Sequence, residues 1–165
     1  MAEIYLIRHG IAAERTDFEN DAARPLTDIG CQKTLKVAQR LQQIGVKFDL
    51  ILTSPLVRAQ QTAKILQEVD LSPKIVEFPP LAPAGDLQDW VNWWSNSRYN
   101  KSESRLALVG HQPDLGNWTE MLVWGTSQGK LAVKKAGVVG VVLPETTTPI
   151  GNGQLFLLLS PKWLC

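Results

Sequence analysis

Cysteine, histidine and methionine are scarce in this sequence, with two of each among 165 residues. Cys31 and Cys165 lie far apart, and neither belongs to a pair with the spacing of metal ligands. The sequence therefore predicts no disulfide framework, and a reducing compartment is the default expectation. Two histidines that are distant in the chain, without a His-x-x-x-His pair or a carboxylate cluster, also disfavour a metal centre. No metal and no cofactor is expected.

Long hydrophobic runs and an excess of charge of one sign are missing as well. Hydrophobic residues make up 44% of the chain, charged residues 20%, and the formal net charge is +1. This balance is typical of a soluble globular protein, and it favours neither nucleic acid nor a membrane as a partner. The first apolar run, residues 4–7, is too short for a signal peptide or a membrane span. We expect a cytoplasmic, monomeric protein with a single domain over residues 1–165.

Short, nearly continuous apolar runs predict buried β-strands. They cover residues 4–7, 50–52, 106–109, 138–143 and 155–159, with a weaker sixth at 74–78. Helical patterns alternate with the first four of these strands. This alternation predicts a three-layer α/β sandwich, in which helices cover both faces of a mostly parallel sheet. The last two strands have a short connection, so they are expected to form an antiparallel hairpin at one edge.

Each predicted helix has a candidate start signal. One helix follows Thr27 and ends at Gly45, with Leu35, Ala38, Leu41 and Ile44 as its apolar residues. Ser54 and Pro55 are expected to be the N-cap and first residue of the next helix. Asp86 is a candidate N-cap for a third helix, and Pro113 opens a fourth.

Both histidines follow the end of a predicted buried strand. His9 stands in Arg8-His9-Gly10 after the first strand, and His111 follows Gly110 after the strand at 106–109. Arg58 lies one turn into the helix that follows the second strand. Ligand sites in open α/β sheets lie outside the carboxyl ends of the strands. We therefore expect two imidazoles and two guanidiniums to meet at one edge of the sheet.

This set of side chains fits phosphoryl transfer to an imidazole. Arginine binds two phosphate oxygens at once, so Arg8 and Arg58 are the candidate phosphate ligands. Their charges disfavour an imidazolium and would keep His9 neutral and nucleophilic. Gly10 allows close backbone approach, and its N–H could fix the ring or meet the phosphate. His111 would donate to the phosphate from the other side, most usefully when protonated.

The same residues resemble the motifs of the histidine phosphatase superfamily, the phosphoglycerate-mutase-like group. The motifs are Arg8-His9-Gly10, Leu26-Thr27-Asp28-Ile29-Gly30, the Ser-x-x-x-Arg-Ala-x-x-Thr segment at 54–62, and Gly110-His111. Arg24-Pro25-Leu26-Thr27 and Gly110-His111-Gln112-Pro113 are more narrowly similar to the SixA-type phosphohistidine phosphatases. These motifs occur in the family order and extend over most of the chain.

This resemblance implies roles for individual residues. His9 would be the phosphorylated nucleophile, and Arg8, Arg58 and His111 would form the phosphate pocket. Arg24 would add a contact on the substrate side. Apart from the resemblance, we predict that Gly10, Ser54 and Gln112 also bind the substrate. The implied substrate is phosphohistidine on a signalling or carrier protein.

One departure from the family pattern bears on the substrate. Many members carry a general-acid glutamate in a Leu-x-Glu segment after the third strand, whereas residues 80–86 contain no glutamate here. A proton donor typically contributes ~10²–10⁴-fold to rate, and an ester needs it more than a phosphohistidine does. Asp86 remains open as either a helix cap or an acid. No lid is evident between Thr62 and Asp86, so we expect an open, shallow pocket suited to a phosphoprotein.

Three of the six tryptophans form a local cluster, Trp90, Trp93 and Trp94. Trp90 and Trp94 share a helical face and are expected to pack against the sheet. Trp93 would point away and could line a surface that binds a protein.

Other functions remain open at this point. The same His9 chemistry could serve a small phosphomonoesterase or mutase that acts on a metabolite. The chain could instead be a non-catalytic module that binds phosphoproteins, although phosphate binding alone does not need a nucleophile beside the arginines. A metal hydrolase is the weakest alternative.

Overall fold

The computed structural model describes residues 1–164. Cys31 is a free thiol. Cys165, which the sequence predicts to be unpaired, lies outside the described residues. Within residues 1–164, no helix is both long enough and apolar enough to cross a membrane.

Six strands form one sheet in the order β3-β2-β4-β1-β5-β6. They are β1 (Ala2–Arg8), β2 (Leu50–Thr53), β3 (Ile75–Glu77), β4 (Arg105–Gly110), β5 (Val138–Leu143) and β6 (Gln154–Leu159). The β3, β2, β4 and β1 strands are parallel, whereas β5 is antiparallel to both β1 and β6. The mostly parallel sheet and the antiparallel hairpin at its edge confirm the predicted architecture.

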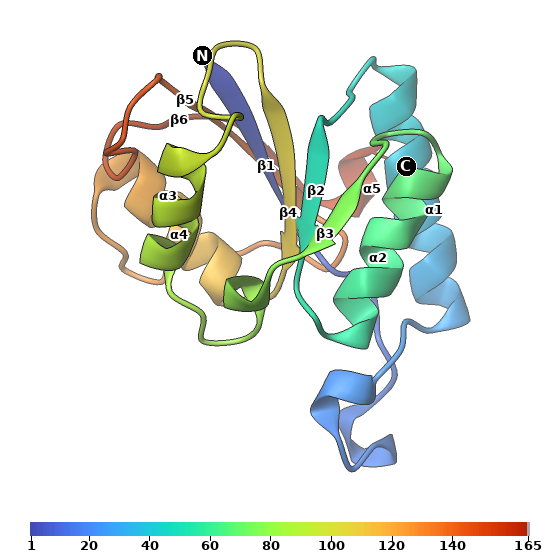
Figure 1. The fold of residues 1–165 in the computed structure, drawn as a ribbon. Coiled ribbons are helices and arrows are strands. Elements are labelled where there is room, and N and C mark those ends of the chain that lie inside the picture. The colour runs from blue at the N-terminus through green and yellow to red at the C-terminus, as the bar shows by residue number, and fades with distance from the viewer. Residues whose placement is uncertain (165) are drawn as a thin grey trace.

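Helices cover both faces of this sheet. They are α1 (Asp28–Gln43), α2 (Val57–Glu68), α3 (Leu87–Asn96), α4 (Asp114–Trp124) and α5 (Pro161–Leu164). Figure 1 shows α3 and α4 on one face and α1, α2 and α5 on the other. Three short 3₁₀ helices, η1 (Arg15–Asp17), η2 (Asp21–Ala23) and η3 (Pro79–Leu81), lie in the connections.

Alternating side chains of the strands divide the core into two clusters. Ile4 and Leu6 of β1 pack with Trp90 and Trp94 of α3, whereas Ile7 of β1 packs on the side of α1 and α2. This is the period-two alternation of a sheet that is buried on both faces. Trp90 and Trp94 are fully buried and stacked with ring centroids 5.8 Å apart, which agrees with the prediction that they pack the core.

Two details of the helices differ from the sequence interpretation. The buried face of α1 contains Val37, Ala38 and Leu41, but Leu35 and Ile44 are exposed at 39% and 54%. The predicted N-cap of α2 is wrong, because α2 begins at Val57 and has Leu56 as its cap, without a capping side chain. The Ser54 hydroxyl instead lies 2.7 Å from His111 Nε2 and accepts a hydrogen bond from the Leu56 N–H. The side chain that the sequence predicts to be the cap is thus bonded to His111, the residue that follows β4.

Candidate active site

The two histidines lie side by side because their strands are neighbours. Arg8, the last residue of β1, is paired with Gly110, the last residue of β4. The His9 N–H then donates to the Gly110 carbonyl at 3.1 Å, and the two imidazole centroids are 5.1 Å apart. Arg58, from the first turn of α2, completes the cluster with its Nε 3.3 Å from His9 Nε2. The predicted meeting of these residues at one sheet edge is therefore found.

The hydrogen bonds of His9 determine which ring nitrogen carries the proton. A carbonyl oxygen only accepts, so the contact of 2.7 Å from Nδ1 to the Gly10 carbonyl requires a proton on Nδ1. A guanidinium only donates, so the Nε2 that faces Arg58 presents its lone pair. Both contacts agree on one neutral tautomer. The nitrogen with the lone pair, Nε2, is the atom available to attack phosphorus.

Burial and neighbouring positive charge keep both imidazoles neutral. Burial lowers the pKa of His9 to about 3, against the opposing hydrogen bond to Gly10, with further lowering by His111, Arg58 and Arg8. Burial and the charge of Arg58 lower the pKa of His111 to about 4. His111 is thus neutral near pH 7 without a ligand, rather than protonated. A phosphate between the rings would act in the opposite direction, because an anion favours the imidazolium.

Two buried nitrogen atoms of the cluster lack a hydrogen-bond partner within the described residues. They are Nδ1 of His111 and Nε of Arg8. The other side of each group is fixed, since His111 Nε2 meets Ser54 and Arg8 Nη1 donates to the Val133 carbonyl at 3.0 Å. Leaving a buried polar group unpaired costs roughly 1–3 kcal/mol, so these atoms are suited to a polar ligand.

Asp21 is a member of the site that sequence reasoning missed. Its Oδ2 accepts from Arg58 Nη2 at 3.1 Å, and its backbone carbonyl accepts from Arg58 Nη1 at 2.9 Å. Its Oδ1 accepts from Arg24 Nε at 2.8 Å. Burial acts to raise the pKa of Asp21, but the Arg24 hydrogen bond and the Arg58 charge bring it below its ordinary value. The spacing of Asp21 and Arg24, three residues apart, was the available signal.

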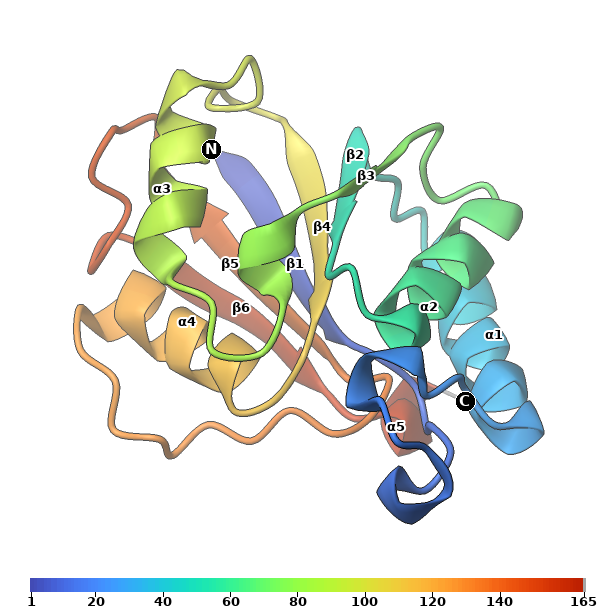
Figure 2. The same ribbon diagram turned by 60° about the horizontal axis from the view of Figure 1, so that its bottom comes forward.

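Arg24 therefore reaches the cluster through Asp21. Its second contact is a hydrogen bond from Nη1 to the Ala13 carbonyl at 2.8 Å. The segment of residues 11–25, which carries η1 and η2, lies beside the start of α2 (Figure 2). This arrangement brings Arg24 close to Arg58, while the predicted contact of Arg24 with a substrate stays a prediction.

Gly10 and Gln112 are held by structural contacts. The Gly10 N–H donates to Thr62 Oγ1 at 3.0 Å, and a Cβ on Gly10 would collide with the Thr34 hydroxyl. The close approach predicted for this glycine is therefore real, but its N–H is directed at α2. The Gln112 amide donates to the Leu131 carbonyl and accepts from the Gly116 N–H. Substrate binding by either residue stays a prediction.

The site is more enclosed than the sequence indicates. His9, Arg58 and His111 are exposed at only 6%, 4% and 3%. Between the end of α2 and Asp86 the chain adds only β3 and η3 as regular structure, yet Asp21 covers Arg58 from the other side. The expectation of a shallow, open pocket is therefore not met in this conformation.

Neither Asp86 nor Trp93 has a contact with the histidines. The Asp86 side chain accepts from the Gln88 N–H at 2.9 Å and caps α3, as one of its two interpretations predicted. Trp93 does not point away from the core as predicted, because it is partly buried between Phe78 and Tyr99, with ring centroids at 5.8 and 6.0 Å; its role in binding a protein stays a prediction.

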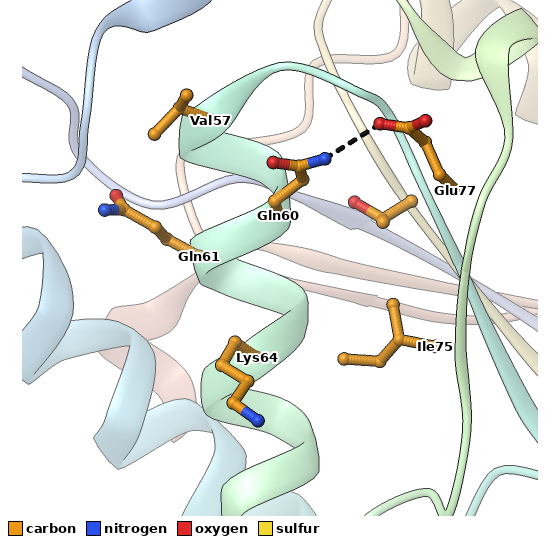
Figure 3. Close-up of a pocket in the computed structure, with 7 residues that line it drawn as sticks. Val57, Gln60, Gln61, Lys64, Ile75 and Glu77 are labelled. Carbon is orange, nitrogen blue, oxygen red and sulfur yellow. Dashed lines mark hydrogen bonds between the residues drawn. The ribbon is translucent and has the colours of Figure 1, made fainter.

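A separate hollow of about 400 Å³ lies between α2 and β3. Figure 3 shows Gln60 bonded to Glu77 across it, with Lys64 and Ile75 further along. Its lining residues include neither histidine and neither Arg8 nor Arg58. The candidate active site is therefore the cluster of His9, His111, Arg8 and Arg58, which contains the candidate nucleophile and phosphate ligands.

Comparison with known proteins identifies the class to which this fold and site belong. The model of the histidine phosphatase superfamily (branch 1) matches residues 4–80. The chain belongs to this superfamily. An uncharacterised protein of Picosynechococcus is 47% identical over 164 residues, which are 98% of each chain.

The similarity to SixA proteins of this superfamily extends over nearly the whole chain. The phosphohistidine phosphatase SixA of Escherichia coli is 28% identical over 160 residues, which cover 96% of this chain and 94% of that protein. The solved structure of the protein histidine phosphatase SixA complexed with tungstate has a TM-score of 0.86 at 27% identity and covers 99% of both chains. This relationship supports a phosphatase activity.

Proposed function

We propose that this protein is a metal-independent phosphohistidine phosphatase. It would remove phosphate from a histidine of a signalling or carrier protein through a covalent intermediate on His9. The observation that carries the proposal is the state of His9 Nε2, which is unprotonated and faces Arg58 at 3.3 Å in a buried site.

The first step forms a bond between His9 Nε2 and phosphorus and breaks the bond from phosphorus to the substrate nitrogen. A phosphohistidine whose ring carries a proton leaves as neutral imidazole and needs little help from an enzymatic acid. Water then attacks the phospho-His9 and releases inorganic phosphate, which regenerates the neutral ring. In both steps Arg8 and Arg58 would bind the equatorial phosphate oxygens.

The carboxylates near the site favour phosphohistidine over a phosphate ester. Asp86 caps α3, and Asp114 accepts from the Ala84 N–H, so both have structural contacts. Asp21 is bonded to two arginines that stabilise its charge, and an ionised carboxylate is a poor proton donor. An alkoxide leaving group would lack the acid that it needs.

The proposal is tested by hydrolysis of a phosphohistidine-bearing carrier domain beside a panel of phosphate monoesters. Wild type and His9→Ala are compared, with circular dichroism to verify the fold of the variant. We expect rapid loss of phosphohistidine with wild type only, and an alkali-stable phosphate label on wild-type His9 after rapid quenching. A chelator should leave the wild-type rate unchanged.

Other results would contradict distinct parts of the proposal. A preference for a monoester, abolished by His9→Ala, would keep the nucleophile and move the substrate to a metabolite. Near-normal turnover by a folded His9→Ala protein would remove the mechanism. Tight phosphoprotein binding without turnover or label would indicate a binding module.

A further inference from the structure

A hollow of about 490 Å³ beside the candidate active site is surrounded by positive charge. Its basic residues are Arg8, Lys33, Lys134, Lys135 and Lys162, and no acidic residue lines it. A second hollow of about 250 Å³ shares Lys33 and Lys162 with the first and adds Lys36. We call the five lysines, Lys33, Lys36, Lys134, Lys135 and Lys162, the basic surface.

The basic surface is assembled from three distant segments of the chain. Lys33 and Lys36 lie on α1, Lys134 and Lys135 on the connection before β5, and Lys162 on α5. Within residues 1–164 none of the five forms an ion pair, and all five side chains are exposed. Because the net charge of the chain is only +1, this concentration is a local feature and not a general excess of charge.

The basic surface is tied directly to the catalytic strand end. Arg8 lines the hollow and also belongs to the histidine cluster. The turn that follows Lys135 is bonded to the same residues, since the Ala136 N–H meets the carbonyls of Arg8 and His9 at 3.1 Å. The Arg8 N–H in turn donates to the Gly137 carbonyl at 3.1 Å. A molecule that approaches His9 from the side of this hollow would therefore also contact the lysines.

We propose that the basic surface docks an acidic segment of the protein that carries the phosphohistidine. This inference rests on the proposed function. It goes beyond it by naming the side of the molecule on which the partner lies and the charge of the partner surface.

The character of the side chains favours a protein over a small anionic metabolite. A second phosphate group of a small metabolite is best bound by rigid, buried donors. Arg58 is a donor of this kind, with 4% exposure, but the five lysines of the basic surface are not. The lysines are exposed, flexible point charges spread over two adjoining hollows, which suits a broad acidic face. Trp163, beside Lys162 and 72% exposed, adds an aromatic side chain of the type enriched at protein interfaces.

The test uses two phosphohistidine peptides that differ only in four flanking residues, Asp/Glu in one and Asn/Gln in the other. The reversal variant is Lys134→Glu/Lys135→Glu/Lys162→Glu, and the three Lys→Gln changes form a milder second variant. The control variant is Lys74→Glu/Lys101→Glu, which alters exposed lysines that precede the amino ends of β3 and β4, whereas His9 and His111 follow the carboxyl ends of their strands. Each protein is assayed at low and high salt, and phosphoramidate serves as a substrate without a peptide.

We expect wild type and the control variant to prefer the acidic peptide by ~10-fold in kcat/KM at low salt, mainly through KM, with the preference lost at high salt. The reversal variant should lose or invert the preference, the Gln variant should be intermediate, and all should hydrolyse phosphoramidate equally. An unchanged preference in a folded reversal variant would overturn the docking proposal.

Direct binding separates this proposal from the proposed function. The unphosphorylated acidic peptide, labelled with a fluorophore, is titrated with each protein and followed by anisotropy. Binding that wild type shows and the reversal variant loses would support the basic surface even if neither phosphopeptide were hydrolysed. Absence of salt-sensitive binding to wild type would overturn it even if phosphohistidine were the substrate.

Discussion

Arg58 joins His9 of the candidate site to Asp21. Its three nitrogens donate to His9 Nε2, to the Asp21 carbonyl and to the Asp21 carboxylate. Loss of one donor to a transition state commonly costs ~10²–10³ in rate. We expect Arg58→Ala, and likewise Arg8→Ala, to lose activity by this factor in steady-state assays. Arg58→Lys should recover little, because an ammonium cannot reproduce the planar fork; full recovery would show that charge alone matters.

The pKa values of the two imidazoles predict the pH profile of the free enzyme. His9 and His111 titrate at about 3 and about 4, both below the ordinary value of 6.5. The neutral nucleophile is therefore fully present from pH 7 down to about pH 5. We expect kcat/KM to show no acidic limb near pH 6.5, when measured against blanks for the acid lability of phosphohistidine. A clear limb at that pH would mean that a charged His9 or His111 exists in the free enzyme.

At the scale of elements, substitutions at Asp86, the N-cap of α3, can distinguish the two roles that the sequence left open for it, helix capping and acid catalysis. Asp86→Asn keeps a good N-cap and removes the acid, whereas Asp86→Ala removes both. We expect Asp86→Ala to lower the free energy of unfolding by about 1 kcal/mol and Asp86→Asn to have little effect on it, as measured by urea denaturation. Both should retain wild-type turnover. A large loss of rate in Asp86→Asn would make Asp86 the missing acid.

The elements themselves could be predicted from the sequence wherever burial imposes a simple period. Continuous apolar runs such as residues 106–109 identify strands covered on both faces, and the strand ends then place His9 beside His111. The prediction failed where a side chain has a distant partner. Ser54 looks like a helix cap in the local sequence, but its hydroxyl meets His111, 57 residues away.

Asp21 illustrates the same limit within the site. It lies in a polar, irregular segment without periodicity, and its contact with Arg58 spans 37 residues. The local sequence offers one signal, Arg24 three residues further on, but this spacing does not indicate the contact with Arg58. The proton on His9 Nδ1 and the neutral state of His111 likewise follow from burial and contacts that only the folded chain defines.

At the scale of the whole molecule, two buried neutral imidazoles connect stability to pH. In the unfolded chain both rings take up protons near pH 6.5, whereas the folded protein does not until about pH 4 and below. The unfolded state therefore binds more protons in this window, and stability falls as the pH decreases through it. Each ring contributes a slope of up to about 1.4 kcal/mol per pH unit. Urea denaturation between pH 7 and pH 5 should show the decrease, and a His9→Asn/His111→Asn protein should show a flatter dependence.

The contacts of Asp21 with Arg58 also affect how strongly the site can bind phosphate. Every nitrogen of Arg58 has an internal partner, and one of these partners is itself an anion. An incoming phosphate must therefore share the guanidinium with a carboxylate or exchange with it. The binding free energy of phosphate then reflects the difference between its contact with Arg58 and the contact that Asp21 gives up. It is therefore smaller than the free energy of the phosphate–arginine contact alone. After hydrolysis the same carboxylate would compete with the product for Arg58, so we expect free phosphate to be a weak inhibitor that leaves the site readily.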